Sequence, residues 1–327
     1  MNSLNPLKFQ PIFKDKIWGG HKIKTVLNKD FGKLPNCGEV WVLSGVDENQ
    51  TEISNGFLAG NELNELVEVY MGDLVGDKVF RKFGNEFPIL IKFIDANDWL
   101  SIQVHPDDEL AMKRHGSLGK TEMWYIMAAD DDSELICGFS EQIDKDQYQS
   151  HLDNGTLKSI MNFEKVKAGD VFYMPAGRVH ALGPGILLAE IQQTSDVTYR
   201  IYDWDRIDKA GMMRELHIEE ALDAIDFEVQ DDYRSHYDEK KNETVNLVES
   251  PYFTTNLIDL DQGIKKDYSE LDSFVIFICV EGAFQLKSGE HTENVNQGEA
   301  ILLPAMLKQA ELHPLPAAKI LEVYMVL

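Results

Sequence analysis

Cysteines, positive charges and long hydrophobic runs are all scarce in this 327-residue chain. The three cysteines, Cys37, Cys137 and Cys279, are odd in number and widely spaced, which predicts reduced thiols rather than a disulfide framework. No apolar run approaches the roughly 18 residues that a membrane-spanning helix needs. The first residues also lack the apolar segment and cleavage site of a secretion signal. We therefore expect a cytoplasmic protein.

Positive charge is outnumbered by negative charge almost twofold. The chain has 31 Lys and Arg residues against 56 Asp and Glu residues, which gives a formal net charge of -25. Such a surface repels nucleic acids and anionic lipids, so neither is expected as a partner. The acidity itself is typical of a soluble protein. It would also repel a phosphorylated ligand, so a site for one must gather cationic side chains locally.

Short strands dominate the predicted secondary structure. Runs rich in β-branched and aromatic residues, bounded by turn formers, predict strands at 39–44, 88–94, 123–128, 170–174 and 186–191. Helical patterns are fewer and fall at 63–71, 106–114, 143–161 and 215–225. Many short strands without a regular alternation with helices favour an all-β fold with helical decoration, as a sandwich or barrel.

The second part of the chain repeats a pattern from the first. Residues 169–175, Gly-Asp-Val-Phe-Tyr-Met-Pro, match residues 298–304, Gly-Glu-Ala-Ile-Leu-Leu-Pro, and predicted strands flank both copies in the same order. We interpret this as a weak repeat of one barrel unit. The polar and charged stretch 226–247 is the best candidate for a linker. The sequence therefore predicts a first domain at 1–235 and a second at 236–327.

The two copies differ at positions that could carry chemistry. The alignment sets His180 of the first copy against Gln309, and Glu122 against Phe274. The second copy has thus lost polar groups that the first retains. We expect the active site in the N-terminal unit and no metal site in the C-terminal one.

One polar face on the predicted strand at 100–105 suits a metal site. Side chains alternate along a strand, so Ser101, Gln103 and His105 share one face. A polar stripe of this kind usually faces solvent. This one offers nitrogen and oxygen atoms in a row with no long charged side chain, as the interior of a metal-binding barrel would require.

Two further stretches supply candidate partners for this face. Lys120 and Glu122 are two residues apart at the start of a predicted strand, and His180 follows a Pro/Gly turn. Two histidines and one carboxylate suit a divalent transition metal. Each residue alone is more often structural, and it is the combination that favours a metal site.

Two cationic residues lie in unexpectedly apolar surroundings. Lys92 is inside the apolar run 89–94, where an unpaired buried ammonium would be costly, so it must reach solvent or an anion. Arg200 is in the strand-like run 198–202 and offers a planar guanidinium suited to phosphate. An ion pair with one of the many carboxylates is the alternative explanation for both residues.

These motifs, in this order, resemble the type I mannose-6-phosphate isomerase family, in its short form without the large helical insertion. The resemblance is carried by residues 11–20, 38–44, 100–107, 119–122, 175–180, 190–196 and 199–200. It covers most of the chain and thins out toward the C-terminus. It implies two cupin-like (jelly-roll) β-barrels, the second degenerate.

The resemblance also implies roles for individual residues. The positions that match the family's ligands of one zinc ion per chain are Gln103, His105, Glu122 and His180. Those that match residues around the substrate are Ser101 and Lys92 for binding and Arg200 and Lys120 for catalysis, with Glu190 and Asp196 as candidates for the base. Glutamine is an unusual zinc ligand, so its position two residues before His105 is a specific mark of the family.

The implied reaction interconverts mannose 6-phosphate and fructose 6-phosphate through an enediol, with zinc as Lewis acid and a carboxylate or histidine moving the proton. The expected partner is this small phosphosugar, and the protein is expected to be a monomer or a weak homo-oligomer. Two alternatives remain open. A cupin with two histidines and a carboxylate also describes a non-haem iron oxygenase. The other alternative is a non-catalytic sugar-binding cupin module.

Overall fold

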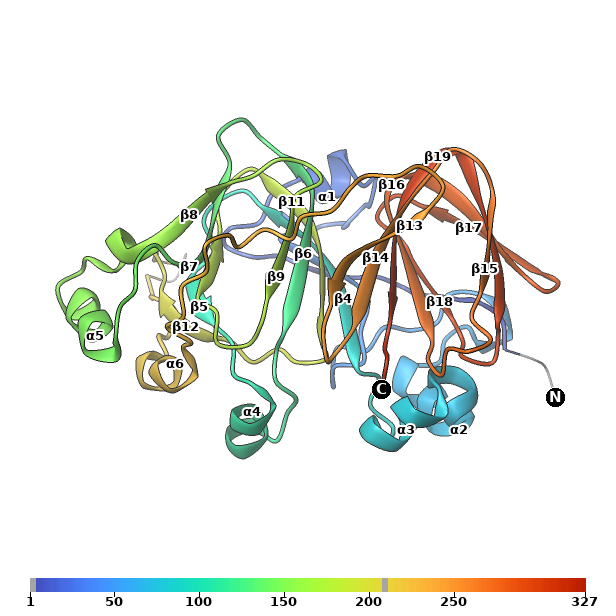
Figure 1. Ribbon diagram of the computed structural model, residues 1–327, viewed down its shortest axis with the longest axis horizontal. Helices are drawn as coiled ribbons and strands as arrows, with labels where there is room; N and C mark the ends of the chain where they lie inside the picture. Colours follow the sequence, from blue (N-terminus) through green and yellow to red (C-terminus); the bar gives the residue numbers. More distant parts are fainter. Residues whose placement is uncertain (1–3, 208–210) are drawn as a thin grey trace.

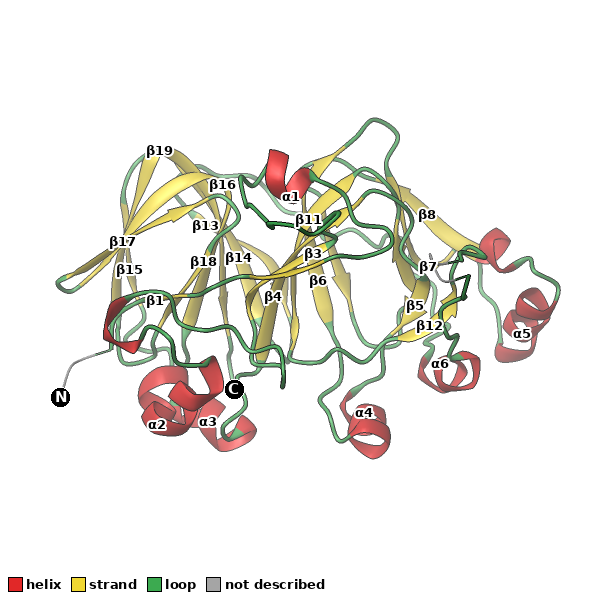
Figure 2. Cartoon of the chain, turned by 180° about the vertical axis from the view of Figure 1, so that it is seen from behind, coloured by secondary structure: helices red, strands yellow, loops and turns green. Residues whose placement is uncertain are grey.

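A computed structural model describes residues 4–207 and 211–327 of the protein and is built mainly from β-strands. The strands form two units that lie side by side along the long axis of the molecule (Figure 1). Short helices lie at the edges of both units (Figure 2). None of the described helices is long and apolar enough to cross a membrane. The predicted fold class, all-β with helical decoration, is confirmed.

The N-terminal unit consists of two facing antiparallel sheets. The six-stranded sheet has the order β2 (Ile12–Lys14), β3 (Glu39–Leu43), β4 (Ile89–Ala96), β11 (Ile186–Gln193), β6 (Glu122–Ala129) and β9 (Val171–Met174). The five-stranded sheet has the order β12 (Tyr199–Tyr202), β5 (Ile102–Val104), β10 (His180–Leu182), β7 (Glu134–Phe139) and β8 (Met161–Lys165). An apolar cluster that draws residues from both sheets fills much of the space between them.

The C-terminal unit is one antiparallel sheet of eight strands. Its main path is β1 (Leu7–Lys8), β18 (Ala300–Leu303), β16 (Val275–Ser288), β19 (Gln309–Tyr324), β14 (Thr254–Leu260) and β13 (Thr244–Glu249), with β15 (Ile264–Asp267) on β19 and β17 (His291–Asn296) on β16. Strands β16 and β19 change partners along their length, so each serves both layers of the unit. Strand β1 is an N-terminal segment, yet it pairs within the second unit.

The two units repeat one topology. The order β3-β4-β11-β6-β9 of the first unit corresponds to β13-β14-β19-β16-β18 of the second. Glu122 pairs with Met174, and Val275 pairs with Leu303 in the second unit. When 169–175 is aligned on 298–304, Glu122 therefore corresponds to Val275.

The sequence alignment that set Glu122 against Phe274 was thus wrong by one residue. Val275 faces the core of the second unit, whereas Phe274 faces the core between the two units. Strand pairing decides such a register, and similarity among apolar residues does not.

The six-stranded sheet is buried on both faces because it lies between the five-stranded sheet and the second unit (Figure 1). All eight residues of β4 are buried. Ile91 and Phe93 pack toward the second unit, while Ile94 belongs to the cluster inside the first unit. Lys92 shares the inner face with Ile94. Strand β4 separates two cores, so apolar residues occupy both of its faces. This explains why Lys92 lies inside an apolar run.

The helices lie where the sequence predicts them, but they begin and end at different residues. The predicted ones are α2 (Leu63–Val75), α4 (Asp108–His115), α5 (Lys145–Asp153) with a 3-10 turn at Leu157–Ile160, and α6 (Ile218–Ala224). The structure adds the short helices α1 (Lys22–Thr25) and α3 (Asp77–Phe83). Helix α4 begins where the Asp107 carboxylate accepts a hydrogen bond from Leu110 N and ends at Gly116 in the left-handed conformation.

The predicted linker contains no helix, and its last residues begin β13 at Thr244. The predicted division at 235/236 stays a prediction.

Packing between the two units is expected to dominate stability. The rings of Phe87 and Phe274 are fully buried with centroids 4.6 Å apart. Phe274→Ala is expected to lower the free energy of unfolding by roughly 3–5 kcal/mol, because it removes buried surface and leaves a cavity. Urea unfolding followed by tryptophan fluorescence measures this change. The control is Phe57→Ala at a ring that is 47% exposed. If both variants lost the same free energy of unfolding, packing between the units would not dominate stability.

Candidate active site and metal centre

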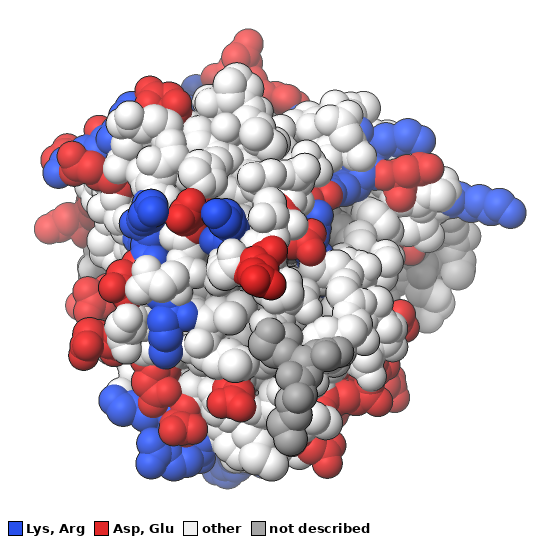
Figure 3. Space-filling model, turned by 90° about the vertical axis from the view of Figure 1, so that its right-hand side faces the viewer, with Lys and Arg blue, Asp and Glu red and all other residues white. Residues whose placement is uncertain are grey.

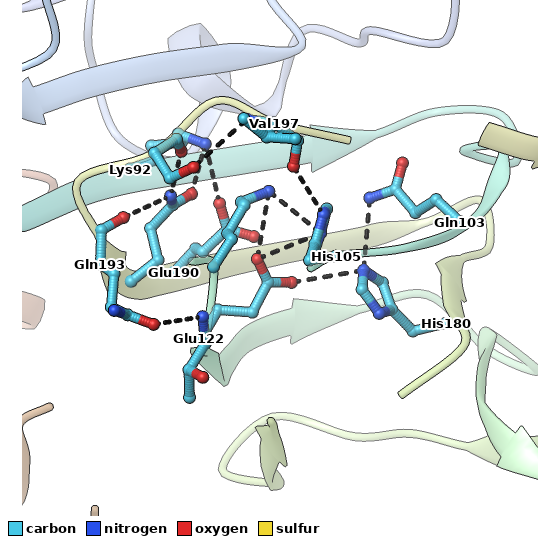
Figure 4. Close-up of polar contacts among 12 residues, drawn as sticks. Lys92, Gln103, His105, Glu122, His180, Glu190, Gln193 and Val197 are labelled. Atoms are coloured by element: carbon cyan, nitrogen blue, oxygen red, sulfur yellow. Dashed lines mark hydrogen bonds and ion pairs between the residues drawn. The ribbon is translucent and has the colours of Figure 1, made fainter. Parts of the chain in front are cut away.

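Three buried side chains from the two sheets of the first unit converge on one point (Figure 4). Glu122 begins β6, His180 begins β10, and His105 follows the last residue of β5. His105 Nε2 lies 3.6 Å from Glu122 Oε2, and His180 Nε2 lies 3.4 Å from Glu122 Oε1. Two strands of one sheet thus face one strand of the other across the barrel interior.

Backbone contacts orient both imidazole rings for metal binding. His105 Nδ1 lies 3.0 Å from Val197 O, and His180 Nδ1 lies 2.9 Å from Arg178 O. A carbonyl only accepts, so each Nδ1 carries the proton and donates, and each Nε2 lone pair faces the cluster. Burial lowers the pKa of His180 to about 4 and the pKa of His105 well below its ordinary value. Both rings are therefore neutral near pH 7, the form that binds metals.

Glu122 has the environment of a carboxylate that needs a cation. Burial, followed by the negative charge of Glu190, raises the pKa of Glu122 to about 7. Lys120 Nζ lies 3.2 Å from Glu122 Oε2, yet neither carboxylate oxygen accepts a well-formed hydrogen bond from the described residues. Buried acceptors are normally satisfied. Two carboxylate oxygens that face two imidazole lone pairs therefore fit a bound metal ion.

Gln103 lies beside the cluster on β5. Its Nε2 is 3.3 Å from His180 Nε2, and its Oε1 accepts a hydrogen bond from Ser101 Oγ at 3.2 Å. The two ends of an amide differ only in assignment. A half-turn of this amide would direct Oε1 toward the point on which the three side chains of the cluster converge. Nε2 could then donate to Ser101. Gln103 is thus placed as a fourth ligand, and its ligand role stays a prediction.

A cavity of about 300 Å³ opens over the cluster. Eight of the ten predicted site residues line it, namely Lys92, Ser101, Gln103, Lys120, His180, Glu190, Asp196 and Arg200. The other two, His105 and Glu122, lie behind Lys120, whose Nζ is 3.1 Å from His105 Nε2. Five Lys and Arg side chains line the cavity against three Asp and Glu side chains. A chain with a charge of -25 has thus built a locally cationic cavity.

Lys92 and Glu190 form a buried ion pair in the cavity wall (Figure 4). Lys92 Nζ lies 3.1 Å from Glu190 Oε1 and donates to Gln192 Oε1 at 2.6 Å. Trp124 Nε1 donates to Glu190 Oε2 at 3.0 Å. Burial alone would lower the pKa of Lys92 and raise that of Glu190, but the two opposite charges outweigh it. Both groups are therefore held ionised, and the ion-pair alternative for Lys92 holds.

The remaining predicted residues lie toward the rim. Arg200 is partly buried on β12, and its Nη1 donates to Glu215 O at 2.8 Å. Burial, followed by the charge of Arg214, lowers the pKa of Arg200, so this guanidinium is poorly compensated. Asp196 is exposed in the connection between β11 and β12.

Several cavity residues were missed by the sequence analysis. Glu39 accepts a hydrogen bond from Trp41 Nε1 at 2.8 Å and lies 3.0 Å from Lys16 Nζ. Arg214 also lines the cavity and pairs with Asp203. Lys16 and Glu39 lie in the segments 11–20 and 38–44. These segments resembled the family but showed no residue pattern typical of a functional site. No sequence pattern connects Arg214 with Arg200.

Sequence comparisons identify the family. Two family models match, one described as the phosphomannose isomerase type I catalytic domain at residues 7–158 and one as the mannose-6-phosphate isomerase cupin domain at 243–315. Mannose-6-phosphate isomerase ManA of Bacillus subtilis is 36% identical over 316 residues, which are 94% of this chain and 95% of that protein. The chain belongs to the type I phosphomannose isomerase family.

Other members of the type I phosphomannose isomerase family agree with this assignment. The mannose-6-phosphate isomerase of Streptococcus mutans is 34% identical over 93% of both chains. A crystal structure of the mannose 6-phosphate isomerase from Bacillus subtilis superposes with a TM-score of 0.87 at 31% identity, covering 99% of this chain and all of that one. A putative mannosephosphate isomerase from Archaeoglobus fulgidus has a TM-score of 0.79 at 20% identity, which shows the shared fold. The predicted resemblance and the cupin-like fold are confirmed.

The second unit of this phosphomannose isomerase family member differs from the first at the positions of the cluster, and its expected lack of a metal site stays a prediction. Among the residues that the structure describes, His105, Glu122 and His180 form the one group of three that could hold a metal. The corresponding strands of the second unit carry Val275 and other apolar residues on their inner face.

Glu39 is expected to make stability depend on pH. Burial would raise its pKa, but Lys16 and Lys92 hold the pKa at about 2, below the ordinary value of 4.5. A lowered pKa stabilises the fold above the unfolded-state pKa, and this contribution is lost as the pH falls toward the folded-state value. Glu39→Gln is expected to lower the free energy of unfolding by on the order of 3 kcal/mol at pH 7. The difference in unfolding free energy between this variant and the parent protein should become smaller as the pH falls from about 5 to about 2.

Urea unfolding across this pH range measures the effect. The control is Glu290→Gln at an exposed turn. If the difference in unfolding free energy between the Glu39 variant and the parent stayed constant with pH, the ionised Glu39 carboxylate would not be its source.

Proposed function

We propose that the chain interconverts mannose 6-phosphate and fructose 6-phosphate at one zinc ion held by Gln103, His105, Glu122 and His180. The observation that carries this proposal is the buried Glu122 carboxylate facing two neutral imidazole nitrogens. Two nitrogens and a carboxylate oxygen, with an amide oxygen close by, suit zinc. When bound, zinc would supply a Lewis acid for the charge that develops on the sugar oxygens in an enediol pathway.

The cationic cavity wall would bind and orient the substrate. Arg200 is the least compensated cation of the wall and is proposed to hold anionic oxygens of the phosphosugar. Lys92 and Ser101 would position the sugar, and Lys120 would share the charge that develops near the metal point. These contacts offset the repulsion of a phosphate by an acidic protein.

A carboxylate must move the proton between two neighbouring carbon atoms. Glu190 is held ionised and fixed by Lys92 and Trp124, and it lies close enough to Glu122 to raise its pKa. Asp196 is exposed at the rim. This geometry favours Glu190 as the base and leaves Asp196 as the second candidate.

Family membership and the cationic cavity favour the isomerase over the two alternatives, and no observation on this chain favours an iron oxygenase or a non-catalytic module. We also propose that the enzyme works in the cytoplasm, because its three cysteines are buried and unpaired with one another. The monomeric or weakly associated state stays a prediction.

Metal removal tests the proposed centre. Turnover of mannose 6-phosphate, coupled to detection of fructose 6-phosphate, is expected to be lost on chelation and restored by zinc. His105→Ala is expected to reduce bound zinc at least 10-fold, because it removes a ligand, as measured by elemental analysis. The control His313→Ala changes an exposed histidine of β19 and should retain full zinc. Turnover that is indifferent to chelation would end the metal proposal.

Arg200→Ala tests the proposed anion contact. Loss of this guanidinium is expected to lower kcat/KM by roughly 100-fold or more, since a charged contact to the reacting molecule is lost. Zinc content and the unfolding midpoint should be retained. The control Arg81→Ala removes an exposed cation of α3. A normal kcat/KM in the Arg200 variant would remove Arg200 from the mechanism.

A further inference from the structure

The second unit contains a cavity of its own, of about 520 Å³. It is lined by residues of β13, β14, β15 and β19 and of the turn that follows β15. Among them are the rings of Tyr268 and Tyr324 and the carboxylate of Glu322, which is 1% exposed. A cavity with a buried carboxylate in its wall is unusual enough to require an explanation.

This cavity occupies the place of the catalytic cavity in the repeated topology. Glu190 pairs with Lys92 on one side and Trp124 on the other. Glu322 pairs with Asn256 and Phe277 in the same two directions. The second unit has therefore kept a carboxylate at the position of Glu190, although it has lost the metal cluster.

A lysine pairs with this carboxylate, as Lys92 pairs with Glu190 in the first unit. Lys266 Nζ lies 2.9 Å from Glu322 Oε1, which also accepts a hydrogen bond from Tyr268 Oη. Glu322 Oε2 accepts a hydrogen bond from Asn256 Nδ2 at 2.9 Å. The strand that carries Lys266 is β15, which corresponds to β5 of the first unit. The carboxylate is thus held rigidly without an added ion.

The fixed groups keep hydrogen-bonding capacity toward the cavity. Lys266 donates to Glu322 and to Thr244 Oγ1, at 2.8 Å, which leaves a third N–H. Thr244 can still donate its own hydroxyl proton, and each carboxylate oxygen of Glu322 has more than one acceptor direction. Alternating donors and acceptors beside the faces of Tyr268 and Tyr324 suit a molecule with many hydroxyl groups and apolar C–H surfaces.

The charges in this cavity do not suit a phosphate. One lysine faces three acidic residues, Glu322, Asp267 and Glu270, whereas cations outnumber acids in the catalytic cavity. Acidic and basic side chains are also interspersed on the outer end of this unit rather than gathered in a basic patch (Figure 3). A phosphorylated sugar would be repelled here, and a neutral one would not.

We propose that the cavity of the second unit is a separate, non-catalytic binding site for a neutral sugar or similar polyhydroxylated molecule. Lys266 and Thr244 hydrogen bond to its hydroxyl groups, the buried Glu322 holds Lys266 in place, and Tyr324 packs on the apolar face of the ligand. The site is independent of the proposed metal centre, because no residue lines both cavities.

Ligand-observed NMR and calorimetric titration of the zinc-loaded enzyme with D-mannose and D-glucose test this site. Binding to the second cavity is expected to weaken at least 10-fold in Thr244→Val, which keeps the shape and removes the hydroxyl, and in Tyr324→Ala. The matched control is Thr292→Val, at an exposed position of β17, which should bind as the parent does. If Tyr324→Ala fails to fold, the two threonine variants decide the result.

Arg200→Ala separates this site from the catalytic cavity. Hexose binding that persists in this variant and is lost in Thr244→Val supports the second site, whether or not isomerase turnover is found. Binding that is lost in Arg200→Ala and unchanged in Thr244→Val would assign the hexose to the catalytic cavity and overturn the proposal. Absence of measurable binding of either hexose would overturn it as well.

Discussion

The need to compensate buried charges between two facing sheets governs the whole first unit. Glu122, Glu190, Lys92 and Lys120 are all at least 94% buried between two sheets. Lys92 and Glu190 satisfy each other. Glu122 is contacted by Lys120 at one oxygen but also faces two neutral imidazoles that can only accept at Nε2, so its charge is only partly compensated. Burial of an uncompensated carboxylate is costly. A cation bound by this group would therefore stabilise the interior as well as serve the proposed chemistry.

The same constraint explains how an acidic protein accommodates an anionic substrate. The cavity concentrates cations that are only partly neutralised by the wall, with Arg200 the least compensated. A site enclosed by protein is screened less by solvent than the surface is. A few local cations therefore outweigh the distant negative charges of the exterior.

The two units show two solutions to one architectural problem. Both keep a carboxylate on the strand that corresponds to β11, Glu190 in the first unit and Glu322 in the second. The first unit pairs Glu190 with Lys92 and also holds a separate group of side chains that could bind a metal. The second supplies its own cation as Lys266 and closes the network with Tyr268 and Asn256. The second unit therefore contains a polar cavity rather than a wholly apolar core.

The sequence by itself determined what depends on local spacing. Alternation along a strand placed Ser101 and Gln103 on one face, the Pro/Gly turn placed His180 at a strand start, and capping residues located α4. Together with the family resemblance, this predicted the fold class and ten candidate site residues. The structure brings these residues to one cavity and the cluster behind it, and their roles stay predictions.

Only the tertiary structure decided what depends on long-range pairing. It set Glu122 against Val275 instead of Phe274. It also brought Lys16, Glu39 and Arg214 into the cavity and paired strand β1 with the second unit. Contacts between residues far apart in the chain leave no periodic trace in the sequence. They follow from which strands pair and which faces are buried, and these are properties of the assembled sheets.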